Sequence, residues 1–404
     1  MADGQDSETA VFRRRVFYIP GYDPIHPRRY RELYRKEGAD QARISGYGLM
    51  LAPKMAKGPY GWHVSSQMNG QQTEADFEVL VWSDIVKASM DQGIARTYLQ
   101  LLRTAWAYIG SGALFRLMRL RKGPMIAALY PIVFLIAQLG LALLAGWGIG
   151  ALVAHFSHWS FGVLAGGAVV WAMLRSFRRW DNKVFAYYLM HDYAYSAQAR
   201  GANPAELETR MAAFRAAIAG ALDEDIDEVL VVGHSSGAHL AVSILSDLIR
   251  AGLPAKAPAL AFLSLGQVVP MVSFLPEARR LRGDLAYLSA RDELTWVDVT
   301  APGDGCAFAL CDPVAVTGVA PAAKRWPLIQ TAAFTQTLSP ERWAALRWRF
   351  FRLHFQYLCA FDRPGFYDYF QITAGPQPLA LRYAGRPAAK SRIETALSGY
   401  KTTA

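Results

Sequence analysis

The chain has 404 residues, of which 52% are hydrophobic and 19% are charged, and its formal net charge is +10. This length is enough for one large domain or two ordinary ones, and the hydrophobic fraction is high for a soluble protein. Three cysteines, an odd and small number, argue against a disulfide framework. Cys306 and Cys311 lack the further Cys and His partners of a zinc site, so we expect neither a metal nor a cofactor.

The first part of the chain alternates between turn signals and short apolar runs. Its opening segment is polar and then basic, without the apolar region of a signal peptide. The apolar runs predict strands at residues 15–19 and 77–82 and, between them, an added hairpin near residues 44–51 and 62–67. The first strand ends at a Pro-Gly turn that leads into Tyr22.

Residues 94–109 have the periodicity of an amphipathic helix. One stripe of this helix would consist of Ile94, Tyr98, Leu101, Leu102, Ala105, Tyr108 and Ile109. Such a helix can lie along a membrane surface or pack on a protein core, and the sequence is compatible with both interpretations.

Residues 123–174 contain no Lys, Arg, Asp or Glu. Two apolar segments in this block, near residues 126–146 and 159–174, are long enough to cross a hydrocarbon core of about 30 Å. We expect the turn between them to use Gly146, Gly148, Gly150 and the following HFSHWS stretch. Small residues on the second segment would let the two helices approach closely, namely Gly162, Gly166 and Gly167.

Basic residues lie at both edges of this uncharged block. They are Arg116, Arg119, Arg121 and Lys122 before it, and Arg175, Arg178, Arg179 and Lys183 after it. This distribution predicts a transmembrane hairpin with both ends in the cytoplasm, and therefore a multi-pass protein of the inner (cytoplasmic) membrane. The alternative is a pair of buried core helices. We attribute the positive net charge to contact with the lipid bilayer, because no nucleic-acid-binding motif is present.

After the block, strands and helices alternate. Asn203-Pro204 precedes a predicted helix, strands are predicted at residues 228–232, 259–265 and 295–300, and a helix is predicted at residues 236–249. This alternation predicts an α/β fold with a mainly parallel sheet flanked by helices. We expect residues 1–110 and 184–390 to form this body, residues 111–183 to form the inserted hairpin, and residues 391–404 to be a mobile tail.

The most informative stretch is VLVVGHSSGAHLAVSILSDL at residues 229–248. An apolar run ends at Gly233, Ser235 lies between Gly233 and Gly237, and a helical pattern begins at once. A strand, then G-x-S-x-G, then a helix is the pattern of a nucleophile elbow, in which a strained turn projects the serine hydroxyl beyond the sheet. The stretch resembles the elbow of the α/β-hydrolase superfamily, and in particular of lipase-like and esterase-like serine hydrolases.

That resemblance implies a base and an acid that follow the serine in the order Ser, acid, His. His354 follows Ser235 at a distance, whereas His234 and His239 lie in or beside the elbow and are expected to be structural. His354 stands in an alternating pattern that we interpret as the end of a strand. Asp304, in a Gly-Asp-Gly turn, is the expected acid, with Asp298 and Asp312 as alternatives.

The resemblance also implies an oxyanion hole formed by the N–H groups of Ser236 and Tyr22. The expected function is a membrane-anchored serine hydrolase that cleaves an ester or thioester, with a lipid or a small acyl ester as substrate. Two alternatives remain open: an acyltransferase that uses the same triad, and a non-catalytic membrane scaffold built on a hydrolase fold.

Overall fold

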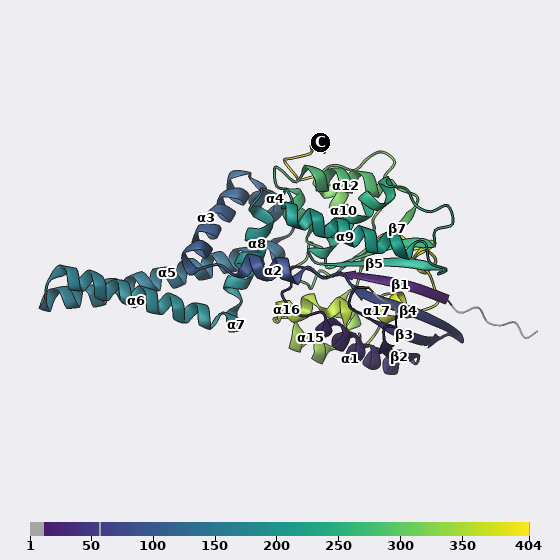
Figure 1. Ribbon diagram of the computed structural model, residues 1–404, viewed down its shortest axis with the longest axis horizontal. Coiled ribbons are helices and arrows are strands. Elements are labelled where there is room, and N and C mark those ends of the chain that lie inside the picture. The colour runs from purple at the N-terminus through teal and green to yellow at the C-terminus, as the bar shows by residue number, and fades with distance from the viewer. Residues whose placement is uncertain (1–11, 56–57, 404) are drawn as a thin grey trace, which may run out of the picture.

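The computed structural model describes residues 12–55 and 58–403, and its centre is an eight-stranded sheet (Figure 1). The strand order is β2-β3-β4-β1-β5-β6-β7-β8. The bounds are β1 Phe12–Ile19, β2 Gly48–Pro53, β3 Gly61–Met68, β4 Gln71–Val79, β5 Glu228–His234, β6 Ala259–Leu265, β7 Leu294–Thr300 and β8 Leu328–Thr331. The neighbouring strands from β4 through β1, β5, β6 and β7 to β8 pair in parallel. At the other edge, β2 pairs with β3 and β3 pairs with β4, both antiparallel. The predicted α/β fold with a mainly parallel sheet is confirmed.

Helices cover both faces of the sheet (Figure 1). One face packs against α9 (Ala205–Ala221), α10 (Gly237–Arg250) and α12 (Arg279–Ser289). The other packs against α1 (Arg28–Ser45), α16 (Phe350–His354) and α17 (Tyr369–Ala374). The remaining short helices of the body are α11 (Val269–Ser273), α13 (Pro313–Thr317), α14 (Phe334–Thr337), α15 (Pro340–Leu346) and α18 (Leu379–Arg382).

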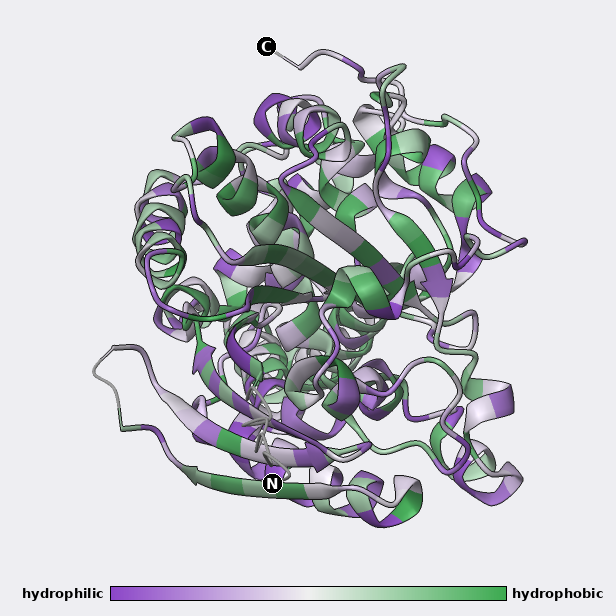
Figure 2. Ribbon diagram, turned by 90° about the vertical axis from the view of Figure 1, so that its right-hand side faces the viewer, coloured by the Kyte–Doolittle hydropathy of each residue, from purple (hydrophilic) through white to green (hydrophobic). Residues whose placement is uncertain are grey.

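The central strands are apolar on both sides because both sides are covered. In β5, Val229 and Val231 face the first layer of helices, while Leu230 and Val232 face the second. Figure 2, which views the body from the end opposite the hairpin, shows this hydrophobic centre and the more polar outer helices. β5 therefore ends in the middle of the molecule, between two packed layers.

The uncharged block forms two long helices that project from the body, α5 (Lys122–Phe156) and α6 (Trp159–Arg179) (Figure 1). Both are long and apolar enough to span a membrane. Only 28% of the most apolar stretch of α5 and 17% of that of α6 is buried, so the alternative of two buried core helices is wrong. Large apolar side chains such as Leu144, Trp147 and Leu164 are exposed along the hairpin.

The two helices touch at glycines. A Cβ atom placed on Gly162 would lie 2.5 Å from the carbonyl oxygen of Gly150, and one placed on Gly166 would lie 2.6 Å from that of Gly146. The expected role of Gly162 and Gly166 is confirmed, whereas Gly167 faces open space.

The turn of the hairpin is shorter than expected. Helix α5 continues through Gly146, Gly148 and Gly150 to Phe156, and only Ser157 and His158 separate it from α6. The glycines do not break α5, because the contact with α6 stabilises it along this length.

Shorter helices connect the hairpin to the body: α2 (Ser83–Met90), α3 (Ile94–Gly110), α4 (Ala113–Leu120), α7 (Asp181–Val184) and α8 (Ala186–Ala197). The predicted stripe of α3 is divided between two environments. Leu101 and Tyr108 are buried, while Leu102 and Ile109 are exposed. One side of this helix therefore packs on protein, as the core-packing interpretation predicts, and the other presents apolar groups outward; contact with a membrane surface stays a prediction.

Three expectations for the body need correction. The hairpin strand predicted near residues 44–51 begins only at Gly48, because residues 44–45 still belong to helix α1. The strand predicted at residues 77–82 is β4, Gln71–Val79, and lies earlier in the chain. Strand β8 was not predicted, because its four residues give too short a pattern. Residues 391–403 run along the body: Ile393 pairs with Cys311, and the carbonyl oxygen of Thr402 accepts a hydrogen bond from Arg282.

Candidate functional site

Ser235 stands at a sharp turn between β5 and α10. Its φ angle is +56°, a conformation that is uncommon for a residue with a side chain and costs of order 1–3 kcal/mol. The backbone N–H of Ser235 donates to the carbonyl oxygen of Leu265, 2.9 Å away, at the end of the neighbouring strand β6. The strand, turn and helix thus follow in the predicted order.

The flanking glycines are required by close approach of other backbone segments. A Cβ atom on Gly233 would lie 2.8 Å from the Cα atom of Ala238, and one on Gly237 would lie 2.1 Å from the carbonyl oxygen of Ile19. Real Cβ atoms do not come this close, so any larger residue would open the turn.

The turn after β1 lies directly against Ser235. Strand β1 pairs with β5 so that Ile19 is opposite Gly233, and the two strands end at the same edge of the sheet. A Cβ atom on Gly21 would lie 2.9 Å from the Cβ atom of Ser235 and 3.4 Å from its Oγ atom. Gly21 therefore leaves the space that the serine side chain occupies.

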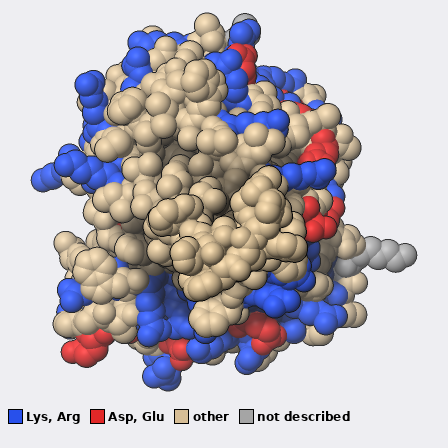
Figure 3. All heavy atoms as spheres, turned by 90° about the vertical axis from the view of Figure 1, so that its left-hand side faces the viewer, with Lys and Arg blue, Asp and Glu red and all other residues tan. Residues whose placement is uncertain are grey.

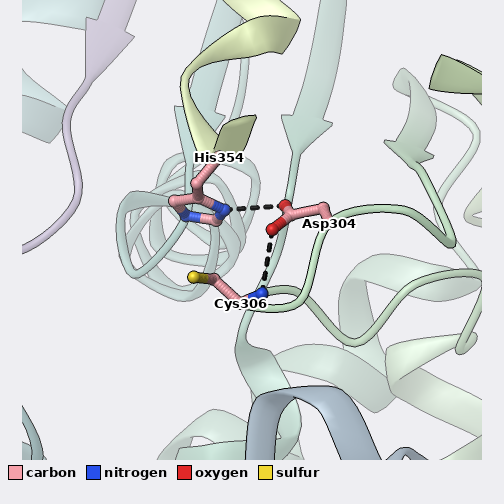
Figure 4. Close-up of side chains that lie close together, drawn as sticks. All are labelled: Asp304, Cys306 and His354. Atoms are coloured by element: carbon pink, nitrogen blue, oxygen red, sulfur yellow. Dashed lines mark hydrogen bonds and ion pairs between the residues drawn. The ribbon is translucent and has the colours of Figure 1, made fainter. Parts of the chain in front are cut away.

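Asp304 and His354 form a buried pair. The Nδ1 atom of His354 lies 2.7 Å from Oδ2 of Asp304 (Figure 4). The same carboxylate accepts hydrogen bonds from the hydroxyl of Tyr357 at 3.1 Å and from the backbone N–H of Cys306 at 2.9 Å. Burial favours a raised pKa for Asp304, but the imidazole of His354 and these hydrogen bonds outweigh it and hold the pKa below its usual value.

His354 and Ser235 line one cavity, and Gly266 lies against the ring of His354. Gly266 follows the strand whose last carbonyl group bonds to Ser235 and has a φ angle of +53°. A Cβ atom there would lie 3.1 Å from Cε1 of His354 and 2.7 Å from Cε2 of Tyr357. Glycine at this position allows the imidazole to approach the elbow.

The prediction that His354 ends a strand is wrong. It is the last residue of the short helix α16, and a 3₁₀ turn, Gln356–Leu358, follows. The alternating pattern misled because Leu353 and Tyr357, four residues apart, are both buried on the sheet. The helical geometry still brings the side chain of His354 to Asp304.

His234 is buried beneath His354 and holds its backbone. The Nε2 atom of His234 lies 3.0 Å from the carbonyl oxygen of His354, and the two rings are 4.8 Å apart. Burial and the neighbouring imidazole lower the pKa of His234 to about 3, so this ring is neutral and can donate. His239 is also buried, which lowers its pKa to about 4. The contacts of His234 agree with a structural role, whereas the buried Nδ1 atom of His239 has no hydrogen-bond partner within the described residues and the residue lines the cavity.

The two alternative acids lie elsewhere. Asp298 accepts a hydrogen bond from Ser264 at 2.5 Å, and burial raises its pKa to about 8. Asp312 caps helix α13 and pairs with Lys324 at 2.6 Å. Of the three candidates, only Asp304 contacts His354 within the described part of the chain.

The two predicted oxyanion donors lie side by side beside the serine. The N–H of Tyr22 donates to the hydroxyl of Ser236 at 3.2 Å, and both residues line the cavity. Within residues 12–55 and 58–403, no acceptor is found for the N–H of Ser236. The hydroxyl of Ser236 must therefore rotate away before both amides can bind a ligand oxygen.

The cavity contains groups that the sequence did not single out. Asp192 and Tyr188, from α8, line it, and the hydroxyl of Tyr188 donates to the carbonyl oxygen of Tyr22 at 2.5 Å. Burial raises the pKa of Asp192 to about 7, although the charge of His354 opposes the shift. Asp192 is half-buried, and the available signal in the sequence was a lone acid within the aromatic helix YLMHDYAYSA.

Comparison of the chain with protein-family models, curated proteins and solved structures found no match.

Cys306 lies close to the Asp304–His354 pair. Ligand atoms of the three side chains lie within 4.8 Å of one another, a spacing that could hold a metal ion. Burial, followed by the charges of Asp304 and Asp192, raises the pKa of the Cys306 thiol well above its usual value. A thiol with a raised pKa is a poor nucleophile.

Proposed function

We propose that the protein is a membrane-anchored serine hydrolase that cleaves an ester or thioester of a lipid or another acyl compound. The observation that carries the proposal is the 2.7 Å bond between Asp304 and His354 in the cavity where Ser235 stands at positive φ. A strained serine, an imidazole and a buried carboxylate that orients it are the components of nucleophilic acyl transfer.

In the proposed reaction, Ser235 Oγ attacks the acyl carbonyl carbon while Nε2 of His354 takes its proton. Asp304 holds the other ring nitrogen, which fixes the tautomer and stabilises the imidazolium. The N–H groups of Ser236 and Tyr22 bind the oxyanion after the Ser236 hydroxyl has turned away. The imidazolium then protonates the leaving alcohol or thiol, and water activated by His354 hydrolyses the acyl-enzyme.

The hairpin supports the membrane part of the proposal. The 21 residues of α6 correspond to about 31 Å of helix, close to the thickness of a hydrocarbon core of about 30 Å. Both ends of the hairpin return to the body, beside Arg121 and Lys122 at one end and Arg178 and Arg179 at the other. Figure 3 views this end of the molecule and shows an uncharged centre with Lys and Arg around it. Basic flanks favour the cytoplasmic side of the inner membrane.

The test is ester hydrolysis by the full chain in neutral detergent, with Ser235→Ala protein as the control. Release of the free acid in water, which Ser235→Ala abolishes, supports hydrolysis. Accumulation of the transferred acyl group when an alcohol or amine is added, with little free acid, would show an acyltransferase instead. Equal activity of the two proteins would show that Ser235 is not the nucleophile, and no activity in either would favour a non-catalytic scaffold.

A further inference from the structure

A second hollow, of about 810 Å³, opens beside the cavity that contains Ser235. The two share four lining residues, Asp23, Tyr188, Phe351 and Phe355, so they are adjacent. The second hollow is also lined by five basic residues: Arg29, Lys36, Arg342, Arg349 and Arg352. We call this hollow the basic groove.

Four of these five cations have no acidic partner. Arg342 pairs with Glu37 at 3.3 Å and Asp362 at 3.2 Å. In the described part of the chain, no carboxylate lies within 4.0 Å of the other four cations, which are Arg29, Lys36, Arg349 and Arg352. All four are exposed. They are free to bind an anion.

The two acids of the groove are occupied by internal contacts. Asp23 accepts hydrogen bonds from the hydroxyl of Tyr30 at 2.7 Å and from the N–H of Ile25 at 2.9 Å. Glu37 accepts from the N–H of Ala360 at 3.0 Å and pairs with Arg342. The groove therefore keeps an excess of positive charge toward any ligand that enters it.

Aromatic side chains stand at the boundary between the groove and the cavity. The ring of Phe351 lies 5.2 Å from that of Phe185 and 5.9 Å from that of Tyr188. Phe351 belongs to α16, the helix that carries Arg352 and His354 and begins after Arg349. An anion in the groove would thus be held by the same short helix that supplies the imidazole.

Part of the cavity lining is apolar and includes the first turn of the hairpin helix α5. The apolar residues are Tyr108 of α3, Pro124 of α5, Leu189 of α8, and Met271 and Val272 of α11. This apolar side suits a hydrocarbon chain. The cavity that contains the serine therefore has an apolar part of its own and the basic groove beside it.

We propose that the site binds an amphiphile from the bilayer, an acyl ester whose alcohol part carries a phosphate or carboxylate. Its acyl chain lies on the apolar side, its ester at Ser235, and its anionic group in the basic groove on Arg349 and Arg352. This assignment rests on the proposed hydrolase function. The ester C–O bond breaks as the acyl group bonds to Ser235 Oγ, and the anionic alcohol leaves with the proton from His354. Water then releases the fatty acid.

The test separates binding from catalysis by using Ser235→Ala protein in neutral detergent, with dodecyl phosphate as the probe in calorimetric titrations. We expect dodecyl phosphate to bind and dodecanol to bind less well. Adding Arg349→Gln and Arg352→Gln together should weaken dodecyl phosphate binding by about tenfold or more, because two charge-assisted contacts are lost. Binding of dodecanol should stay the same. Arg347→Gln is the matched control, because Arg347 lies over the ring of Trp348 and does not line the groove.

Three results would overturn the groove assignment. The first is equal binding of dodecyl phosphate and dodecanol. The second is unchanged dodecyl phosphate binding by the Arg349→Gln/Arg352→Gln protein. The third is displacement of bound dodecyl phosphate by inorganic phosphate at equal concentration. If the groove-dependent binding is found but wild-type protein hydrolyses no ester, the hydrolase proposal fails and the anion site stands. If wild type hydrolyses neutral and anionic esters equally well, the hydrolase proposal stands and the groove assignment fails.

Discussion

The Nδ1 atom of His354 bonds to Oδ2 of Asp304 across 50 positions of sequence. The bond joins the turn after β7 to the end of α16, and both lie at the edge of the sheet where β5 delivers Ser235. This pairing fixes the orientation of the His354 imidazole, as the proposed role of a general base requires.

We expect Asp304→Asn to lower kcat for ester hydrolysis by about 10³-fold or more, because the amide would favour the wrong tautomer of His354. KM should change little. The measurement is steady-state hydrolysis of a neutral ester. Asp298→Asn is the matched control, since Asp298 is equally buried but bonds to Ser264. Equal losses in the two variants would assign Asp304 a merely structural role.

We expect Gly266→Ala to lower kcat by about 10²-fold, because its methyl group would displace the imidazole of His354. The matched control is Gly252→Ala, which also replaces a glycine of positive φ, +91°, but has no neighbouring atom within 4 Å. Both variants carry similar backbone strain, so both should lose thermal stability. Only Gly266→Ala should lose activity, and unchanged kcat would contradict the assigned position of His354.

Asp192 predicts a pH-dependent stability. Because its folded-state pKa is about 7, above the usual value near 3.9, the folded protein holds this proton more tightly than the unfolded chain. Stability from this group is present at low pH and is lost as the pH rises toward 7. Asp192→Asn should therefore raise the melting temperature more at pH 8 than at pH 5, measured by thermal denaturation in neutral detergent. The same increase at both pH values would contradict the assignment.

The hairpin can be tested through its glycine contacts. Gly162→Leu places a side chain where a single Cβ atom already lies 2.5 Å from the carbonyl oxygen of Gly150, so α5 and α6 must separate. We expect faster proteolysis of the hairpin and a lower melting temperature. Gly167→Leu on the same helix meets no neighbour and should behave as wild type. Identical behaviour of the two variants would disprove the packing of α5 on α6.

Local patterns predicted the features that depend on local sequence. The turn at Ser235 could be predicted because G-x-S-x-G stands between an apolar run and a helical pattern, and the hairpin because 52 successive positions contain no Lys, Arg, Asp or Glu. Helix α9 was visible because its buried residues Leu207, Met211 and Phe214 recur with helical spacing.

Features that depend on tertiary contacts were not predictable in the same way. His354 was wrongly predicted to end a strand, because the buried residues of a short helix can give the same alternating pattern as a strand. The choice of Asp304 over Asp298 required the relative positions of the turn after β7 and helix α16. The roles of Gly266 and Asp192 follow from neighbours far away in the chain, namely Tyr357 and His354, and no local pattern reports them.

The most direct measurement is the mass of the intact protein after incubation with a fluorophosphonate, followed by peptide mapping of the adduct. One phosphonyl group on Ser235 is expected in the wild-type chain, none on Ser235→Ala, and much slower labelling of His354→Ala because the hydroxyl loses its base. Labelling of another residue, or labelling of wild type and His354→Ala at the same rate, would contradict the proposal that His354 activates Ser235.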